Sequence, residues 1–337
     1  DSFDCCNDLV CIIHQKVLVA RGNQVFHLKY LTWQKLVINP TTSSMPISSK
    51  VLLLLLVSFS TLHNKSVALA MATSPARLEG QRVLVTGAGR GIGRSIALIC
   101  SRHGAKVAIA SRTRSELEET VSLASDTAAA EAMEVFVSDV TKEDEGEDMV
   151  ESIVRKWGGI DILVNNAGGS QAAKGAHETL SSSDLRRLLD LNVVGVHAVS
   201  SGVLRHAMLP AGSGRIVNIS SRAGKLGLPN YSFYVASKFA LEGMTASLAE
   251  ELKDKGVSVN SISPGMVNTK SFPKPPGRKG VREAESIEAG LFAVLETTAT
   301  GRYLHVDELD EARAAGLPDS LALKPINEPK FDPTKLK

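Results

Sequence analysis

Residues 81–103 read Q-R-V-L-V-T-G-A-G-R-G-I-G-R-S-I-A-L-I-C-S-R-H, and this stretch decides the fold. An apolar run that predicts a strand over 81–86 is followed by a glycine-rich turn and by an amphipathic run that predicts a helix over 95–103. Glycines at such a junction let backbone N–H groups and the helix N-terminus approach a pyrophosphate. The stretch therefore predicts dinucleotide binding, although glycine-rich loops also occur as simple turns.

Apolar runs and helical patterns alternate along the chain that follows. Strands are expected at 105–111, 134–137, 160–165, 215–220, 257–262 and 300–306, and helices at 143–157, 183–209, 231–253 and 283–295. Strands that alternate with helices imply right-handed crossovers and a parallel sheet. We therefore expect an α/β fold, a Rossmann-type doubly wound parallel sheet in a single domain over 78–306, with helices on both faces.

The composition is that of a globular protein with a sizeable core, because 43% of the residues are hydrophobic. The formal net charge is +2, and residues 1–70 carry six Lys/Arg against three Asp/Glu, so the remainder is close to neutral. A near-neutral body offers no electrostatic footprint for nucleic acid. Only Cys100 of the four cysteines follows residue 70. We therefore expect neither a disulfide framework nor a metal site, since no Cys/His cluster has metal-ligand spacing.

The two ends of the chain differ from its body. Residues 1–70 are expected to lack stable structure, and two interpretations stay open: translated upstream sequence without function, or an organelle or secretory targeting segment within 45–70. Without such targeting we expect a cytoplasmic protein. The apolar run 51–57 is too short for a bilayer, which needs about 20 residues. The tail, 307–337, is expected to form an extra helix or a loose end.

A second stretch, residues 221–238, reads S-R-A-G-K-L-G-L-P-N-Y-S-F-Y-V-A-S-K and carries the chemistry. Tyr234 and Lys238 are four residues apart near the start of an expected helix, so they share one helix face. The ammonium is expected to lower the pKa of the tyrosine from about 10 towards working pH, which suits a general acid. Ser221, after the preceding strand, is expected to hydrogen-bond the same substrate oxygen. Tyr231, one turn earlier, is expected to pack or to contact substrate.

The end of the second expected strand bears on the choice of cofactor. An acidic residue there would bind a ribose 2′-hydroxyl, as in NAD-dependent enzymes. The chain instead has Ser111 and Arg112, with Arg90 in the glycine-rich turn and Arg114 nearby. Guanidinium groups pair well with phosphate, so NADP(H) is favoured over NAD(H). The alternative is that these arginines are solvated surface charges.

With these motifs in order, the chain resembles the short-chain dehydrogenase/reductase family, and within it the 3-oxoacyl-carrier-protein reductases. The resemblance is close over about 80–270 and looser to about 306. Residues 86–93 match the family's T-G-x-x-x-G-x-G turn, 165–168 match N-N-A-G, and 264–269 match P-G-x-x-x-T.

The resemblance implies a catalytic tetrad of Asn192, Ser221, Tyr234 and Lys238. Ser221 would polarise a substrate carbonyl, Asn192 would hold a water in a proton relay, and Lys238 would also bind the nicotinamide ribose. N-N-A-G would steady the sheet beside the cofactor. The expected cofactor contacts are Gly87, Arg90, Gly91, Ile92, Gly93, Ser111, Arg112, Asp139, Val140, Asn166, Ala167, Gly168, Tyr234, Lys238, Pro264, Gly265, Val267 and Thr269.

The resemblance implies NADP(H)-dependent reduction of a ketone, such as a 3-oxoacyl thioester, to a secondary alcohol. The alternatives are a dehydrogenase of a steroid-like or other small secondary alcohol, and a catalytically silent NADPH-binding sensor or scaffold. The basic, Pro-rich loop at 270–282 either guides an anionic substrate, such as an acyl thioester on a phosphopantetheine carrier, or is a solvated loop. The resemblance also implies a homodimer or homotetramer through the helices at 183–209 and 231–253, whereas the short apolar run 51–57 leads us to expect no stable membrane span.

Overall fold

The structure is a computed structural model that describes residues 8–13, 16–21, 24–29, 77–124, 126–270, 272–275 and 277–327. The chain divides into two units, Asp1–Thr73 and Ser74–Lys337. In the first unit, expected from the sequence to lack stable structure, three strands form an antiparallel sheet: β1 (Asp8–Ile13), β2 (Lys16–Arg21) and β3 (Gln24–Lys29). The targeting segment predicted within 45–70 lies outside the described residues.

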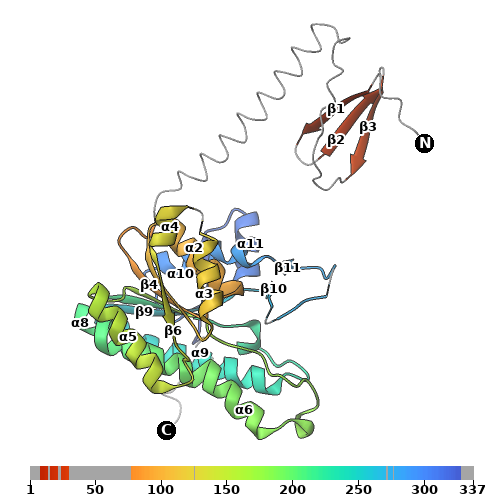
Figure 1. The fold of residues 1–337 in the computed structure, drawn as a ribbon. Helices are drawn as coiled ribbons and strands as arrows, with labels where there is room; N and C mark the ends of the chain where they lie inside the picture. The colour runs from red at the N-terminus through yellow and green to blue at the C-terminus, as the bar shows by residue number, and fades with distance from the viewer. Residues whose placement is uncertain are drawn as a thin grey trace. The chain divides into compact units, whose positions relative to one another are not determined.

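A sheet of eight strands forms the centre of the second unit (Figure 1). Its strands are β4 (Arg82–Thr86), β5 (Lys106–Ser111), β6 (Met133–Val137), β7 (Ile162–Asn165), β8 (Gly214–Ile219), β9 (Val257–Ser263), β12 (Arg302–His305) and β13 (Leu323–Pro325). Their order is β13-β12-β9-β8-β7-β4-β5-β6, and all neighbours are parallel except β12 and β13. The order reverses between β4 and β7, which confirms the Rossmann-type doubly wound α/β fold.

Both faces of the sheet are buried, as the near-continuous apolar strands require. Successive residues of one strand point to opposite faces: Val83 and Val85 join one hydrophobic cluster and Leu84 joins the other. The first cluster includes residues of α2 (Gly91–Arg102), α3 (Arg114–Ser122), α10 (Ile287–Glu296) and α11 (Val306–Ala314). The second includes residues of α5 (Glu143–Trp157), α7 (Gly195–Val203) and α9 (Ser232–Leu252). The expected helices on both faces are therefore confirmed (Figure 1).

The prediction of one continuous α-helix over 183–209 is wrong, because two π-helical turns interrupt the segment. The segment consists of α6 (Ser182–Leu189), η3 (Asp190–Val194), α7, η4 (Leu204–Met208) and α8 (Leu209–Ala211). Single π-helical turns are rare and often mark functional sites. The first of them contains Asn192, which is buried.

The folded unit continues beyond residue 306, the boundary expected from the sequence. Helix α11 follows β12, and β13 then pairs antiparallel with β12 along the edge of the sheet. The remaining short elements are α4 (Thr127–Glu131), β10 (Met266–Val267), β11 (Val281–Arg282), η2 (His177–Thr179), η5 (Arg222–Gly224), η6 (Lys253–Lys255), η7 (Ala284–Ser286) and η8 (Asp319–Leu321). None of the helices in the described residues is long and apolar enough to cross a membrane.

Three large apolar side chains are exposed on the segments expected at an oligomer interface, and one of them, Leu209 at the start of α8, is 41% exposed. Val194 in η3 and Phe239 in α9 are each 47% exposed. Burial of such side chains against a second copy would be favourable. The oligomeric state itself stays a prediction.

One ion pair joins the beginnings of three strands. Arg82 donates to Asp161 from Nε at 2.9 Å and from Nη2 at 2.6 Å, and its backbone N–H donates to the same carboxylate at 2.8 Å. The backbone N–H of Arg215, in β8, donates to the Asp161 carbonyl at 2.9 Å. The hydrogen bond from the Arg82 side chain holds the pKa of Asp161 below its usual range. A depressed carboxyl pKa stabilises the fold above the unfolded pKa, and this contribution is lost as pH falls through the folded one.

We expect Asp161→Asn to lower the free energy of unfolding at neutral pH by about 1 kcal/mol, a hydrogen-bond value discounted for solvent screening. The difference from wild type should shrink in acid, because the wild-type carboxyl is then protonated. Urea denaturation at neutral and acidic pH measures both effects. The control is Asp148→Asn on the exposed side of α5, which should leave the midpoint unchanged. Equal midpoints for Asp161→Asn and wild type at neutral pH would contradict the assignment.

Candidate active site

A cavity of about 1020 Å³ opens where the order of the strands reverses. Its lining includes residues directly after β4, β7 and β8, so it lies at the carboxyl ends of the strands, where open α/β sheets bind ligands. Every residue expected to contact the cofactor lines this cavity, and so does Ser221. Their roles toward a cofactor stay predictions.

Close packing shapes the glycine-rich turn between β4 and α2. Gly87 and Gly91 have φ values of 67° and 55°, a region that favours glycine. A Cβ atom placed on Gly93 would lie 2.2 Å from Nδ2 of Asn166 and 2.4 Å from the carbonyl oxygen of Gly87. The glycines therefore leave the backbone of the turn uncovered at Gly87, Gly91 and Gly93 beside the N-terminus of α2, and this arrangement fits the diphosphate of a dinucleotide.

Hydrogen bonds connect the two strands on either side of the opening. The Thr86 hydroxyl accepts from the backbone N–H groups of Asn166 at 3.1 Å and Ala167 at 3.0 Å. In return the Asn166 carboxamide donates to the carbonyl oxygens of Thr86 at 3.0 Å and Gly87 at 3.2 Å. The end of β7 is thus fixed to the glycine-rich turn, as expected if N-N-A-G steadies the sheet.

Ser221, Tyr234 and Lys238 meet in the cavity although they lie on different elements. Ser221 follows β8 and caps η5, whereas Tyr234 and Lys238 lie in the first two turns of α9. A hydrogen bond joins the side chains of Ser221 and Tyr234. Lys238 Nζ lies 6.0 Å from the centre of the Tyr234 ring and donates to the carbonyl oxygen of Ile219 at 2.9 Å.

Burial sets the protonation of this pair. Loss of solvent raises the pKa of Tyr234, and the hydrogen bond from Ser221 opposes this only in part. The expectation that Lys238 lowers the tyrosine pKa is therefore wrong for this arrangement, because desolvation prevails. Burial also lowers the pKa of Lys238 to about 8, whereas the charge of Glu242, one turn further along α9, raises it. At neutral pH the site thus holds a protonated tyrosine beside a mostly charged lysine.

Asn192 lies behind the cavity and does not line it. Its Oδ1 accepts from the Gly169 N–H at 2.9 Å, and its Nδ2 donates to the Gly169 carbonyl and to Ser237 Oγ, both at 3.0 Å. Asn192 therefore fixes the loop that follows β7. The water relay expected from the resemblance stays a prediction.

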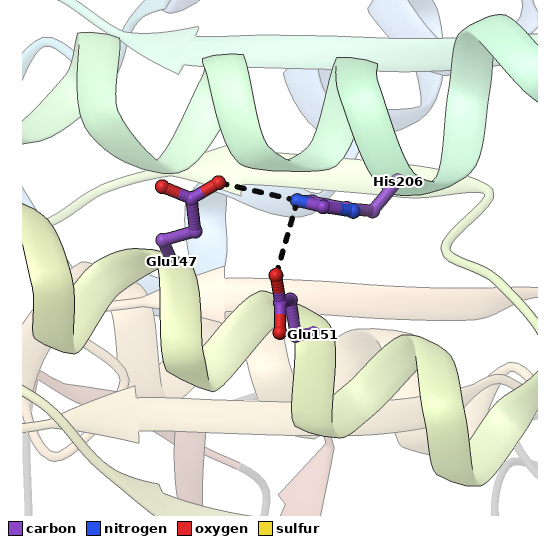
Figure 2. A group of neighbouring side chains, drawn as sticks. All are labelled: Glu147, Glu151 and His206. Carbon is purple, nitrogen blue, oxygen red and sulfur yellow. Dashed lines mark hydrogen bonds and ion pairs between the residues drawn. The ribbon is translucent and has the colours of Figure 1, made fainter.

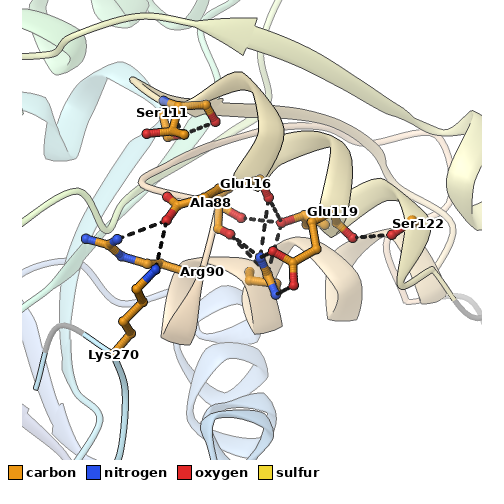
Figure 3. Close-up of polar contacts among 11 residues, drawn as sticks. Ala88, Arg90, Ser111, Glu116, Glu119, Ser122 and Lys270 are labelled. Atoms are coloured by element: carbon orange, nitrogen blue, oxygen red, sulfur yellow. Dashed lines mark hydrogen bonds and ion pairs between the residues drawn. The ribbon is translucent and has the colours of Figure 1, made fainter. Parts of the chain in front are cut away.

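Charged residues gather at the end of the cavity near Gly89, which we call the Gly89 end. Glu116 Oε1 lies 3.0 Å from Arg90 Nη1 and 3.8 Å from Lys270 Nζ (Figure 3). Arg112 is 65% exposed at its side chain, and its nearest carboxylate oxygen in an ion pair, on Asp139, is 3.9 Å away. The sequence does not single out Glu116, which lies on a helix, α3, that we did not predict. The one signal in the sequence that could have identified Glu116 is its negative charge close to the arginine-rich segment 112–114.

A possible metal-ligand cluster lies outside the cavity. Glu147 and Glu151, on α5, face His206 of η4, whose Nε2 is 3.2 Å and 3.6 Å from the nearer carboxylate oxygens (Figure 2). Arg205 also pairs with Glu147, so this carboxylate already has a cationic partner. We interpret the cluster as ion pairs that join two helices, and assign no metal to it.

Comparison with known proteins agrees with this geometry. A family profile described as short chain dehydrogenase matches residues 81–275. An uncharacterized oxidoreductase of Thermotoga maritima is 36% identical over an alignment of 249 residues, and the match covers 68% of this chain and 96% of that protein. The structure of ElxO with NADP bound has a TM-score of 0.61 at 28% identity, and covers 67% of this chain and 96% of its own. The structure of 3-ketoacyl-(acyl-carrier-protein) reductase from Brucella melitensis complexed with NADH has a TM-score of 0.61 at 27% identity, with 68% and 97% covered.

We expect Gly93→Ala to weaken dinucleotide binding strongly, because the new methyl group would collide with Asn166 and with the Gly87 carbonyl. Gly243→Ala is the matched control, since a Cβ there meets nothing within 4 Å and α9 gains a better helix former. Fluorescence titration with NADPH and thermal unfolding would be measured on both variants. Unchanged NADPH affinity in folded Gly93→Ala would show that the turn does not need this close packing.

Proposed function

We propose a function from one premise: the chain belongs to the short-chain dehydrogenase family. It is an oxidoreductase for CH–OH or carbonyl groups. We infer that it reduces a ketone, such as a 3-oxoacyl thioester, to a secondary alcohol with NADP(H). The observation that carries this proposal is the meeting of Ser221, Tyr234 and Lys238 in the cavity beside the glycine-rich turn. The ketoacyl reductase among the similar structures supports the choice of substrate.

When bound, the nicotinamide supplies the hydride. Ser221 and Tyr234 hydrogen-bond each other, so a carbonyl oxygen placed between their hydroxyl groups would accept from both. Tyr234 keeps its proton at neutral pH because its pKa is raised, and donates it to the oxygen as negative charge develops there. The Lys238 ammonium, buried beside the ring, stabilises the tyrosinate that remains.

The preference for NADP(H) over NAD(H) rests on charge at the Gly89 end. Three cations, Arg90, Arg112 and Lys270, face the two carboxylates of Glu116 and Asp139, so one positive charge is in excess. A 2′-phosphate would meet this excess, and Arg112, which is exposed and only 3.9 Å from Asp139 through one nitrogen, could form a bidentate pair with it.

The alternative functions predict different behaviour from the same residues. A dehydrogenase of small secondary alcohols would use Tyr234 as a base, which its raised pKa disfavours at neutral pH. A silent NADPH-binding sensor would need the glycine-rich turn but no hydrogen bond between Ser221 and Tyr234. The reductase proposal accounts for both features.

We expect Tyr234→Phe to lose roughly 100-fold or more of its turnover, because the proton donor is removed, while NADPH binding stays intact. Tyr231→Phe, three residues earlier, is the control and should keep its turnover, since no hydrogen bond of its hydroxyl is found in the described residues. NADPH consumption with a panel of ketones and 3-oxoacyl thioesters measures the rates. Near-normal turnover by Tyr234→Phe would exclude it as the acid.

We expect Arg112→Ala to raise the Kd for NADPH roughly tenfold and to leave the Kd for NADH nearly unchanged, because only NADPH carries the 2′-phosphate. Arg114→Ala is the control, because Arg114 pairs with Glu118 along α3 at 3.9 Å. Both dissociation constants are measured by fluorescence titration. An equal loss for the two cofactors would remove the proposed role of Arg112.

A further inference from the structure

Three basic side chains gather at the end of the cavity away from Gly89, and we call them the basic cluster. Lys174 belongs to the loop after β7, whereas Lys274 and Arg278 belong to the loop between β10 and β11. All three line the cavity. Within the described part of the chain, none of them has an ion-pair partner. The cavity wall thus carries unpaired positive charge contributed by two distant segments.

Contacts with aromatic rings place the basic cluster next to the proposed catalytic tyrosine. The rings of Tyr234 and Phe272 are 6.1 Å apart, and Lys274 Nζ is 5.8 Å from the centre of the Phe272 ring. Lys174 Nζ is 5.3 Å from the centre of the Tyr231 ring, at the start of α9. A single aromatic ring therefore separates Lys274 from Tyr234.

A buried glutamine fixes the loop that carries Lys174. Gln171, 4% exposed, accepts from the backbone N–H of Tyr234 at 3.1 Å and donates to the Asn230 carbonyl at 3.0 Å. In the other loop, the backbone N–H of Lys274 donates to Asn268 Oδ1 at 2.9 Å. Both loops are thus anchored by side-chain hydrogen bonds, so the backbone from which Lys174 and Lys274 extend has a fixed place in the fold.

The three cations repel one another. Burial lowers the pKa of Lys274, and the charge of Arg278 lowers it further; Tyr231 opposes this, and Lys174 lowers the pKa by less than Tyr231 raises it. Elsewhere on the cavity wall the chain supplies carboxylates, as where Arg282 pairs with Asp307 at 2.7 Å. Arg222 is another basic residue of the cavity wall, but its charge acts on the pKa values of His305 and Tyr303 and is not among the causes that shift the pKa of Lys274. An anion at the basic cluster would remove this repulsion.

We propose that Lys174, Lys274 and Arg278 bind the anionic end of the substrate, a carboxylate or a phosphate, while the carbonyl group lies between Ser221 and Tyr234. This rests on the proposed function. The substrate is then a ketone with its anionic group several bonds from the carbonyl, on the far side of Phe272. A free oxo acid and a phosphate ester share this chemistry, and the experiment distinguishes them.

The experiment compares aliphatic methyl ketones of several chain lengths that end in a carboxylate, a phosphate ester or a neutral primary amide. With NADPH, we expect kcat/KM for an anionic ketone to exceed that for its amide roughly tenfold or more, and the ratio of carboxylate to phosphate identifies the preferred group. Added salt should reduce the preference, because the basic cluster is partly exposed. Equal kcat/KM for anions and amides would overturn the subsite and leave the reductase proposal standing.

Substitutions test the residues themselves. Lys174→Met combined with Lys274→Met keeps much of the side-chain length and should strongly reduce the preference for anions, because only Arg278 of the basic cluster remains. Lys279→Met is the matched control, because Lys279 lies in the same loop but does not line the cavity. An unchanged preference in the double variant would overturn the assignment to these residues.

A binding measurement separates the two proposals. The NADPH complex of Tyr234→Phe is titrated with each ketone, and binding is followed by NADPH fluorescence. Tighter binding of the anionic ketones than of the amides supports the anion subsite, whether or not the wild-type enzyme reduces them. If the wild-type enzyme reduces none of the ketones, that result counts against the reductase proposal and not against the subsite. Equal dissociation constants for anions and amides overturn the subsite whatever the turnover.

Discussion

The hydrogen bonds between Thr86 and Asn166 are the constraint on which the cavity depends. The strands β4 and β7 pair with each other where the strand order reverses, and the register of this pair ends at Val85 and Val164, so the residues that follow need hydrogen-bond partners outside the ladder. Polar backbone groups away from water need partners. The Thr86 hydroxyl and the Asn166 carboxamide supply them, with four contacts between 3.0 Å and 3.2 Å. The same contacts leave Gly93 no space for a side chain, so the shape of the turn follows from the way the opening is held.

Burial of the Lys238 ammonium is the second constraint, because a buried charge is unfavourable unless it is compensated. Lys238 is 7% exposed and Glu242, one turn away, is 4% exposed. Oε2 of Glu242 also forms an ion pair with Lys225 Nζ at 3.1 Å and accepts a hydrogen bond from Ser261 Oγ at 3.2 Å. Its Oε1 has no hydrogen-bond partner among the described residues. Compensation is therefore incomplete, and Lys238 keeps a pKa of about 8. Such perturbed groups in a cleft are typical of functional sites, where an easily shifted charge is useful.

The features that could be predicted from the sequence are those that depend on residues close to one another in the chain. The alternation of strands and helices and the glycine-rich turn follow from periodicity and residue type, and the family motifs then identified the residues that line the cavity. Properties that depend on distant partners could not be predicted. The sign of the pKa shift of Tyr234 depends on burial, which four-residue spacing does not reveal. Likewise, the π-helical turn at Asn192 accompanies its contacts with Gly169 and Ser237, and β13 is too short to show a strand pattern.

The two ends of the cavity differ in how their charges are arranged, and this difference has a physical consequence. At the Gly89 end, the Glu116 carboxylate forms an ion pair with Arg90 at 3.0 Å and lies 3.8 Å from Lys270 Nζ. A phosphate that binds there must therefore compete with this carboxylate for the two cations. At the basic cluster no carboxylate of the described residues competes, and the like charges of Lys274, Arg278 and Lys174 disfavour the empty state. The electrostatic free energy of an anion at the Gly89 end is therefore the attraction by the cations minus the repulsion by the carboxylates. At the basic cluster an anion gains the full attraction and also relieves the repulsion between the cations. Charge recognition in this cavity is thus expected to contribute more to the choice of substrate than to the choice of cofactor.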